Sequence, residues 1–460
     1  MCYKNNNTFY YLLILGLIFF GGVNVKDLKK FPIGGIHLPE EKHLTSDLPI
    51  ERIDFPDSVT IPVQMHIGAP CKTIVEEGQE VQRGELIAEN KEALSANIHA
   101  TISGVYKGIV QRPGPDGSQL DCMLIENTGQ ANEELLLERN YDPSEIKQEN
   151  LVDIVKRAGI VGLGGACFPT HVKLDPPPDK PIDTIILNGA ECEPYLTVDD
   201  RLMREKTHIL YQGLNLICEA VGAERGIVAS EINKPEAVQA IKEEAKNWDN
   251  LEGVPLDTRY PHGAEKHLIK AVLDREVPRR GLPMDVGIIV NNIQTVTKIA
   301  EAYYQGHTLI DRVLTASGKG LKEQKNLIVP FGTSVGHIIE YCGGITTADY
   351  HTVMGGPMTG KQITSFDVPV AKGTSGLVVL SPDEYSDAEK RVCIRCGKCV
   401  DVCPMYLPPN RITAFVNNEM YQEAEIAGLN DCIECGACAF VCPSKRPLLR
   451  WIQKGKAKSN

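Results

Sequence analysis

The sequence predicts a multidomain α/β protein, in which a small β barrel, a parallel α/β sheet, a smaller α+β module and a cysteine-rich C-terminal segment follow one another. Its 460 residues are enough for about three domains at roughly 150 residues each. The hydrophobic pattern changes along the chain from short strands with turn glycines to alternating strands and helices, and back again. Eight of the fifteen cysteines fall within residues 393–442, and their regular spacing indicates metal ligation rather than a disulfide scaffold.

The composition indicates a globular protein without a general affinity for nucleic acid. Apolar residues make up 42% and charged residues 23% of the chain, which excludes a disordered or fibrous protein. Phosphate binding requires a basic surface, whereas the formal net charge is −12. Aromatic residues, at 6%, are too few for most proteins that read bases by stacking. We therefore expect no nucleic-acid partner.

An apolar run occupies residues 9–20, within a segment, residues 1–28, that we set apart from the folded domains. The run has twelve residues, whereas a spanning helix needs about 20. Two interpretations stay open. The segment is either an anchor-like membrane contact or a start-site artefact, with the folded protein beginning near Asp27 or Lys29.

Residues 29–135 are expected to form a barrel-sandwich hybrid domain. Short apolar runs between Thr60 and Val110 are separated by turn glycines, as in a small β barrel or sandwich. The pattern is similar to the hybrid barrel of biotinyl and lipoyl domains. Those carriers present a lysine at an exposed hairpin, but Lys91 lies just before the aligned position, so we expect an unmodified structural barrel. The polar residues 111–150 are expected to be a turn-forming insertion.

Residues 136–306 change to buried strands that alternate with helices, which predicts an open, mostly parallel α/β sheet. Ligands bind such sheets at the carboxyl ends of the strands, so the loops at that edge are expected to carry the chemistry. The expected strands are residues 182–187, 226–229 and 287–290, and the expected helices are residues 200–221, 235–246, 264–273 and 294–304.

Three further segments complete the expected domain organisation. Residues 307–375 return to short strands with paired glycines, which fits a small α+β module. The clustered cysteines lie within residues 385–445. The tail, residues 446–460, is basic and contains no acid. Its interpretation stays open between a solvated end and a contact with anionic lipid or an acidic partner.

The cysteine-rich segment contains two copies of one motif, Cys-x-x-Cys-x-x-Cys-x-x-x-Cys-Pro. This is the bacterial two-cluster pattern, in which the fourth cysteine of each copy ligates the cluster of the other copy. A zinc site would show two cysteine pairs around a loop rather than two complete quartets. We therefore expect Cys393, Cys396, Cys399 and Cys442 to ligate one [4Fe-4S] cluster, and Cys432, Cys435, Cys438 and Cys403 to ligate the other. Two adjacent clusters predict electron transfer.

A glycine-rich loop is the first candidate for ligand binding in the α/β region. It contains Gly162, Gly164 and Gly165 and is followed by Lys173. Glycines let backbone N–H groups approach a phosphate, and a nearby lysine adds positive charge. A tight structural turn would explain the loop equally well.

An acidic loop is the second candidate, at the carboxyl end of the expected strand 182–187. It contains Asn188, Glu191 and Glu193. These groups can hydrogen-bond a ribityl chain, a ribose or a nicotinamide amide. They can equally cap a helix.

The two loops together resemble the flavin and NADH site shared by the NADH-binding subunit of respiratory complex I and by the C subunit of the Rnf ion-translocating complexes. The chain from Gly162 reads Gly-x-Gly-Gly-Ala-x-Phe-Pro-Thr-x-x-Lys, and from Asn188 it reads Asn-Gly-Ala-Glu-Cys-Glu-Pro-Tyr-Leu-Thr-x-Asp-Asp-Arg. The Rnf subunit is the closer match, over most of residues 29–445, because further motifs are also similar. They are Phe31-Pro32-Ile33-Gly34-Gly35-Ile36-His37, His66-Ile67-Gly68-Ala69-Pro70, Gly263-Ala264-Glu265-Lys266, Asn291-Asn292-Ile293-Gln294-Thr295 and Met354-Gly355-Gly356-Pro357-Met358.

This resemblance implies FMN and two [4Fe-4S] clusters as cofactors and NAD(H) as substrate. Residues 307–375 would be a soluble ligand-binding β-grasp module, and residues 385–445 a two-cluster ferredoxin domain. Hydride transfer moves two electrons whereas a cluster accepts one, so the flavin would convert between the two. FMN would be held by Gly162, Gly164, Gly165, Lys173, Asn188, Asn291, Asn292 and Thr295, with Glu191 and Glu193 facing the nicotinamide nucleotide.

The implied function is that of the NAD-facing electron-transfer subunit of a membrane-bound complex. The Rnf family passes electrons between ferredoxin and NAD and couples this to the movement of sodium ions or protons. The implied partners are the membrane ion-translocating subunits and the ferredoxin-like subunit of such a complex, with this chain peripheral on the cytoplasmic side of the cell (inner) membrane. Two alternatives are a soluble flavin and iron-sulfur reductase of the cobalamin-reductase type, and a pure ferredoxin-like electron carrier.

Overall fold

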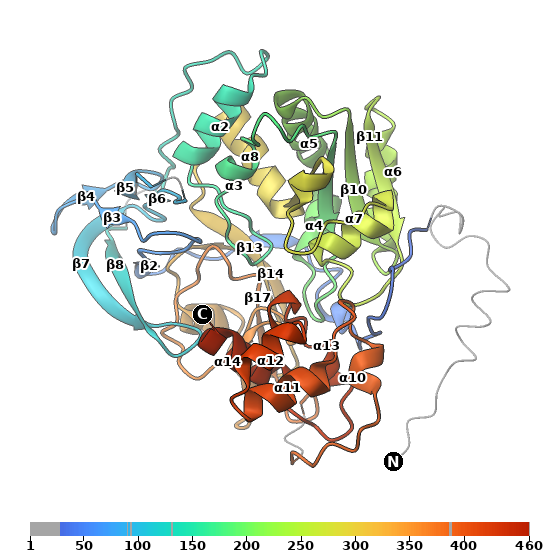
Figure 1. Ribbon diagram of the computed structural model, residues 1–460. Helices are drawn as coiled ribbons and strands as arrows, with labels where there is room; N and C mark the ends of the chain where they lie inside the picture. Colours follow the sequence, from blue (N-terminus) through green and yellow to red (C-terminus); the bar gives the residue numbers. More distant parts are fainter. Residues whose placement is uncertain (1–27, 90, 93, 130–131, 386–388, 460) are drawn as a thin grey trace.

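The structure is a computed structural model that describes residues 28–89, 91–92, 94–129, 132–385 and 389–459. The apolar run at residues 9–20 lies outside the described residues. Across the part of the chain that is described, no helix combines the length and apolar character needed to cross a membrane. Three separate groups of sheets and a helical C-terminal domain are present, so the predicted multidomain α/β fold class is confirmed (Figure 1).

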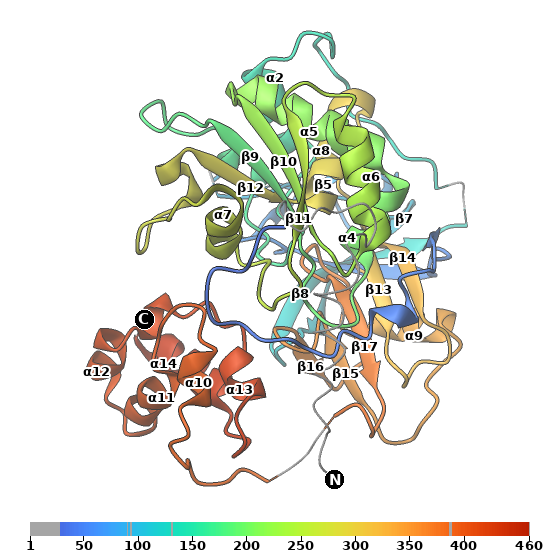
Figure 2. The same cartoon turned by 90° about the vertical axis from the view of Figure 1, so that its right-hand side faces the viewer.

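A four-stranded parallel sheet forms the centre of the α/β domain. Its order is β11 (Leu251–Leu256), β10 (Arg225–Glu231), β9 (Thr184–Gly189), β12 (Ile288–Asn292). Figure 2 shows α7 (Glu265–Leu273) on one face of the sheet and α5 (Thr207–Val221), α6 (Pro235–Ala245) and α8 (Ile293–Gln305) on the other. Ile186 packs in the core on the α7 side, whereas Ile185 and Leu187 pack in the core on the opposite side. Helices thus cover both faces, as parallel sheets require.

Two elements of this domain differ from the prediction. Strand β11 was not predicted, because Gly253 and Pro255 interrupt its apolar pattern. The expected helix at residues 200–221 is two helices, α4 (Val198–Glu205) and α5, which break at Lys206. The N-terminus of α4 lies beside the loop that follows β9, because the N–H of Asp199 donates to Glu191 of that loop.

Two small sheets form the expected barrel and enclose an apolar core that includes Ile61, Ile87 and Met123. The expected insertion at residues 111–150 is wrong in part, because residues 119–127 form a strand that pairs with β7. The first sheet contains β2 (Ser58–Pro62), β8 (Gln119–Asn127), β7 (Gly104–Pro113) and β4 (Glu80–Val81), and the second contains β3 (Lys72–Thr73), β5 (Leu86–Glu89) and β6 (Ile98–His99).

A six-stranded mixed sheet forms the third part of the fold, with α9 (Val335–Tyr341) packed against it. Its first and fourth strands come from outside residues 307–375, so the sheet takes in chain from both sides of the expected module. The boundaries of that module stay a prediction. In order, the strands are β1 (Ile50–Arg52), β14 (Lys325–Pro330), β13 (Asp311–Ser317), β17 (Gly376–Leu380), β15 (His351–Met354) and β16 (Lys361–Ile363).

The C-terminal domain consists of short helices around the two cysteine runs. Its small core contains Leu407, Ile412, Leu429 and Ile452. The last of these residues belongs to the basic tail, so the tail is a helix packed on this domain rather than a free end. The helices are α10 (Lys398–Asp401), α11 (Pro409–Asn417), α12 (Tyr421–Ile426), α13 (Ala437–Phe440) and α14 (Leu448–Ser459).

The N-terminal segment of the described chain runs between the α/β domain and the C-terminal domain (Figure 2). The N–H of Gly35 donates to the carbonyl of Val402 at 3.0 Å. The ring of Phe31 stacks on His267 with 5.2 Å between ring centroids, and His267 Nε2 donates to the carbonyl of Pro404 at 2.9 Å. The two domains are therefore joined through a segment that is distant from both in sequence.

Glu193 joins the loop after β9 to the third sheet. Its carboxylate accepts hydrogen bonds from the N–H groups of Met358 at 3.0 Å and Thr359 at 2.9 Å, and from the Thr359 hydroxyl. Burial raises the pKa of Glu193 from its ordinary value, and these donors oppose the rise. A Cβ at Gly356 would lie 2.3 Å from Glu193 Oε2, so only glycine fits there.

Replacement of Gly356 by alanine should weaken this junction. The added methyl group overlaps the Glu193 carboxylate, and overpacking of a buried contact costs about 1–3 kcal/mol. We expect a lower midpoint of thermal unfolding for Gly356→Ala. Gly336→Ala is the matched control, because its Cβ would approach no neighbouring heavy atom more closely than 3.4 Å. Equal losses in the two variants would contradict the role given to Glu193.

Candidate flavin and iron-sulfur site

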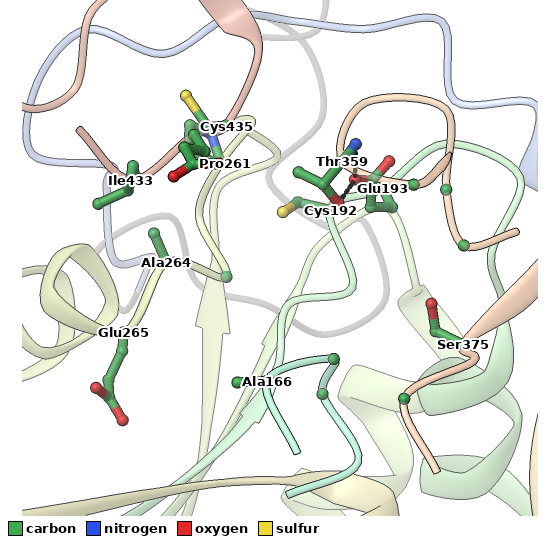
Figure 3. A pocket seen from close by; sticks show the side chains of 18 of the residues that line it. Ala166, Cys192, Glu193, Pro261, Ala264, Glu265, Thr359, Ser375, Ile433 and Cys435 are labelled. Atoms are coloured by element: carbon green, nitrogen blue, oxygen red, sulfur yellow. Dashed lines mark hydrogen bonds between the residues drawn. The ribbon is translucent and has the colours of Figure 1, made fainter. Parts of the chain in front are cut away.

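A cavity of about 1740 Å³ lies at the carboxyl edge of the parallel sheet. It is lined by the glycine loop, the loops after β9 and β11, a segment of the third sheet and the second cysteine run. In Figure 3, Ala166 of the glycine loop lies at the bottom of the view and Ile433 and Cys435 of the cysteine run lie at the top. One cavity therefore connects the candidate flavin loop with a candidate cluster site.

The glycine loop is held from behind and open toward the cavity. The N–H of Leu163 donates to Thr295 Oγ1 at 2.8 Å. A Cβ at Gly164 would lie 3.3 Å from Asn292 Cβ, so the loop packs closely on the end of β12. Gly165 has a φ of +108°, and a Cβ there would meet no heavy atom within 4 Å. This open backbone is the kind of surface that a phosphate or a flavin can approach.

The structure divides the eight predicted flavin residues into two groups. Lys173 Nζ donates to the carbonyl of Val290 at 3.0 Å, and Thr295 is fully buried behind the glycine loop. These two side chains support the loops rather than face the cavity. Gly164, Gly165, Asn188 and Asn292 line the cavity, whereas Gly162, Lys173, Asn291 and Thr295, all of them described, do not.

Both predicted acids line the cavity, but their carboxylates are bound to the protein. Glu191 accepts the N–H groups of Asp199 at 2.8 Å and Asp200 at 3.3 Å, and so caps the first turn of α4. A negative charge is favourable at that end of a helix. Glu193 is held by the backbone of the third sheet. The role of the two acids opposite a nicotinamide nucleotide stays a prediction.

Asp199 is a site residue that the sequence analysis did not identify. It lines the cavity, and its Oδ2 accepts a hydrogen bond from Asn292 Nδ2 at 2.8 Å. Burial, followed by the charge of Glu191, raises the pKa of Asp199 to about 8. Its surroundings therefore favour the protonated form of this carboxyl. The only sequence signal for it is the Asp-Asp pair after the acidic loop.

Cations form the second unpredicted feature of the cavity. Lys266, Arg280 and Lys361 line it, and the fully buried Arg312 donates through Nη2 to the carbonyl of Leu163 at 3.2 Å. Burial lowers the pKa of Arg312 to about 10, which still leaves it charged at neutral pH. A phosphate-bearing ligand is attracted by such charges. The open glycine backbone, two side-chain amides and these cations fit FMN.

The first cysteine quartet lines one small cavity of about 340 Å³. Cys393, Cys396 and Cys399 come from the first cysteine run and Cys442 from the second. Burial raises the pKa of Cys399, and the neighbouring charges of Cys442 and Cys393 add to this rise, so the thiols lie close together. A cavity lined by four thiols fits an iron-sulfur cluster.

The second quartet is more deeply buried. Burial raises the pKa of Cys438, and the charges of Cys432, Cys435 and Cys403 add to the rise. Cys403 comes from the first run, so each group contains the fourth cysteine of the other run, as the predicted ligand sets require. Among the described residues, no group of three or more His, Cys, Asp or Glu side chains is close enough together to bind a single metal ion. A four-iron cluster keeps its thiolates further apart than one ion does.

The second quartet borders the large cavity, whereas the first does not. Cys432 and Cys435 line that cavity, and the Tyr260 hydroxyl donates to the carbonyl of Cys435 at 2.6 Å. Cys393 and Cys396 are exposed and do not line that cavity. The arrangement allows one chain of centres, from the glycine loop through the second quartet to the first.

Substitution of Asp199 should change how stability depends on pH. The folded pKa of about 8 lies above the ordinary value of 3.8, so between these values the unfolded chain has lost a proton that the native protein keeps. Stability therefore falls as pH rises through this window. We expect Asp199→Asn to flatten the fall of the melting temperature between about pH 5 and 8. Asp142→Asn is the control, because Ser144 lowers the pKa of this exposed carboxyl. Parallel curves for wild type and Asp199→Asn would contradict a protonated Asp199.

Three family descriptions match successive parts of the chain. The RnfC barrel sandwich hybrid domain matches residues 29–130, the Nuo51 FMN-binding domain residues 155–301, and the 4Fe-4S dicluster domain residues 392–446. These matches support FMN and two [4Fe-4S] clusters as the cofactors. One solved structure, the NAD+-reducing [NiFe]-hydrogenase in the H2-reduced state, is 17% identical with a TM-score of 0.47 over 69% of this chain and 61% of its own, which is too distant to carry an argument.

Relatives match almost the whole chain. The C subunit of the proton-translocating ferredoxin:NAD(+) oxidoreductase complex of Clostridium ljungdahlii is 44% identical over 93% of this chain and 93% of its own. The C subunit of the Na(+)-translocating ferredoxin:NAD(+) oxidoreductase complex of Acetobacterium woodii is 40% identical over 92% and 96%. The C subunit of the ion-translocating oxidoreductase complex of Rhodobacter capsulatus is 41% identical over 94% and 84%. With the cavity, the two quartets and these relatives in agreement, the chain belongs to the family of C subunits of the Rnf ion-translocating oxidoreductase complexes.

Proposed function

We propose that this chain is the NAD-facing electron-transfer subunit of a membrane-bound complex that couples electron transfer between ferredoxin and NAD to ion translocation. The observation that carries this proposal is the single cavity that joins the glycine loop to the second cysteine quartet. The proton- and Na(+)-translocating ferredoxin:NAD(+) oxidoreductase subunits, 44% and 40% identical to this chain, support it.

The residues that line the cavity would bind and orient FMN. Gly164 and Gly165 would offer open backbone, and Asn188 and Asn292 would offer amide groups at the carboxyl edge of the sheet. When bound, FMN supplies the exchange between two-electron hydride transfer and one-electron transfer. Asp199, whose pKa is raised by burial and by the charge of Glu191, would offer a carboxyl group at the cavity wall. Gly162, Lys173, Asn291 and Thr295 would act as positioning residues behind these groups.

Glu191 and Glu193 would shape the nicotinamide side of the site by holding the loop after β9. Glu191 fixes that loop to α4, and Glu193 fixes it to the third sheet. A loop held at both ends keeps the cavity open without rearrangement when a ligand enters. This assigns the two acids a positioning role in nucleotide binding.

The cysteine quartets would hold the two clusters in crossed ligation, with thiolates as the soft ligands that iron-sulfur clusters require. The partners would be the ion-translocating membrane subunits and the ferredoxin-like subunit of the complex. We propose a peripheral position at the cytoplasmic face of the cell membrane. Association with a membrane is supported by the relatives, which are named as parts of ion-translocating complexes.

Addition of NADH to the full chain, reconstituted with FMN, iron and sulfide without oxygen, should bleach both the flavin and the cluster absorbance. Gly165→Val should lose FMN and the NADH response, because the side chain fills the open side of the loop. Gly78→Val is the matched control, since Gly78 also has a positive φ, of +89°, and open surroundings but lies in the barrel. Bleaching by dithionite alone, with no FMN retained by the wild type, would favour a pure electron carrier and contradict the proposal.

Crossed ligation predicts that Cys403→Ser damages the cluster of the second cysteine run, because Cys403 lies with that run. The reciprocal variant, Cys442→Ser, should damage the cluster of the first run, with which Cys442 shares a cavity. Electron paramagnetic resonance of the two reduced clusters, with iron content, separates these outcomes. Loss confined to the Cys393 cluster in Cys403→Ser would contradict crossed ligation.

A further inference from the structure

We propose that the outer rim of the first cysteine quartet is the surface on which an acidic redox protein docks to exchange electrons with this chain. The outer rim is defined as Val392, Ile394, Arg395, Lys398, Arg411 and Arg446. The inference rests on the proposed function. In that function the flavin cavity is one end of the electron path, and the rim would be the other end.

No residue of the rim lines the flavin cavity. Both views show the segment before α10 along the lower edge of the C-terminal domain, with the α/β domain above (Figures 1 and 2). Cys393 and Cys396 are exposed, whereas Cys435 lines the large cavity and its carbonyl is bonded to Tyr260. An electron that enters at the cavity therefore reaches the surface at the first quartet.

Two apolar side chains beside this quartet are largely exposed to solvent. Val392 is 83% exposed and Ile394 67% exposed, on either side of Cys393. Exposed aliphatic side chains that gather beside a functional centre mark an interaction site. The main chain here is fixed, because the N–H of Arg391 donates to the carbonyl of Ser444 at 3.0 Å. The rim thus presents a fixed apolar centre next to a cluster site.

The charge of the rim is positive in a protein that is negative overall. Arg395, Lys398, Arg411 and Arg446 line the cavity of the first quartet, and no acid of the described chain lines it. Within the described residues, none of these four cations takes part in an ion pair with a carboxylate. The guanidinium of Arg446 lies 4.6 Å from the centroid of the Trp451 ring, which limits its motion.

This charge selects the class of partner. The chain has a net charge of −12, so a second copy or another acidic surface is repelled everywhere except where local positive charge gathers. The partner that fits the rim has an acidic surface around an apolar centre. Its charge would steer it to the rim, and it would bind weakly, as partners in small electron-transfer interfaces do. One electron passes between a reduced centre of one protein and an oxidised centre of the other in each encounter. No bond forms or breaks.

The test is the second-order rate of electron transfer from the reconstituted full chain, reduced with dithionite, to an acidic plant-type [2Fe-2S] ferredoxin followed by its visible circular dichroism. Arg395→Glu/Lys398→Glu should lower this rate at low salt roughly tenfold or more, because steering by opposite charges contributes factors of about 10 to 1,000. At about 1 M salt, where the screening length is about 3 Å, the difference should disappear. Toward a basic c-type cytochrome the same variant should react faster than the wild type.

Lys454→Glu/Lys458→Glu is the matched control. Both lysines are exposed on α14, carry the same charge change and do not line the rim cavity. Iron content and the resonance signals of both clusters must match the wild type in each variant. If the charge-reversal variant disturbs the first cluster, Arg395→Gln/Lys398→Gln is used instead. This charge-removal variant should also lower the rate of electron transfer to ferredoxin, but by a smaller factor.

Equal rates for the rim variant and the control pair, or a wild-type rate that does not respond to salt, would overturn the proposal. Rim-dependent binding to vesicles of anionic phospholipid, with an unchanged rate toward ferredoxin, would also overturn it in favour of a lipid surface. The assay uses dithionite as the reductant, so a failure of NADH to reduce the clusters would count against the proposed function alone.

Discussion

The fold depends on the junction between the α/β domain and the C-terminal domain, because this junction sets the separation of the flavin loop and the nearer cluster site. The Tyr260 hydroxyl bonds to the carbonyl of Cys435, and His267 bonds to that of Pro404 directly after Cys403. Both bonds hold backbone beside a cysteine of the second quartet. Gly35 adds a third bond from a segment near the start of the described chain. Parts of the chain that are remote in sequence thus fix one wall of the cavity.

The loop after β9 shows how buried charge supports a binding site without facing its ligand. Glu191 and Glu193 lie two residues apart, yet one caps a helix and the other binds a neighbouring sheet. Each carboxylate accepts hydrogen bonds from backbone N–H groups. Asp199 is bonded to Asn292, and burial together with the charge of Glu191 raises the pKa of Asp199, which favours its protonated form. Arg312 beneath the glycine loop remains charged. Beside the glycine loop, the charge of Arg312 is therefore favourable to an anionic group such as a phosphate.

The sequence was informative where chemistry imposes a short-range pattern and uninformative where the fold joins distant residues. Cysteine spacing predicted both quartets, and the structure groups Cys403 and Cys442 with the opposite runs. Alternating apolar runs predicted the parallel sheet, but β11 was missed because Gly253 interrupts its pattern. Asp199 and Arg312 could not be identified, because their roles arise only when α4 meets the end of β12 and when β13 meets the glycine loop. The two acids were found by motif, but which donors they bind depends on tertiary contacts.

The two cysteine runs share one spacing but lie in unlike surroundings, and this difference distinguishes an inner cluster site from an outer one. Beside the inner quartet, Lys456 donates to the carbonyl of Cys432 at 2.7 Å and pairs with Glu434, so its charge is balanced. At the outer quartet the lining cations Arg395 and Lys398 have no acid among the described lining residues. Cluster potentials depend on net charge, hydrogen bonds and exposure, so identical ligand sets need not have identical potentials. A duplicated motif accounts for two adjacent centres, and the unequal packing around it makes one of them the inner end and the other the outer end of the same path.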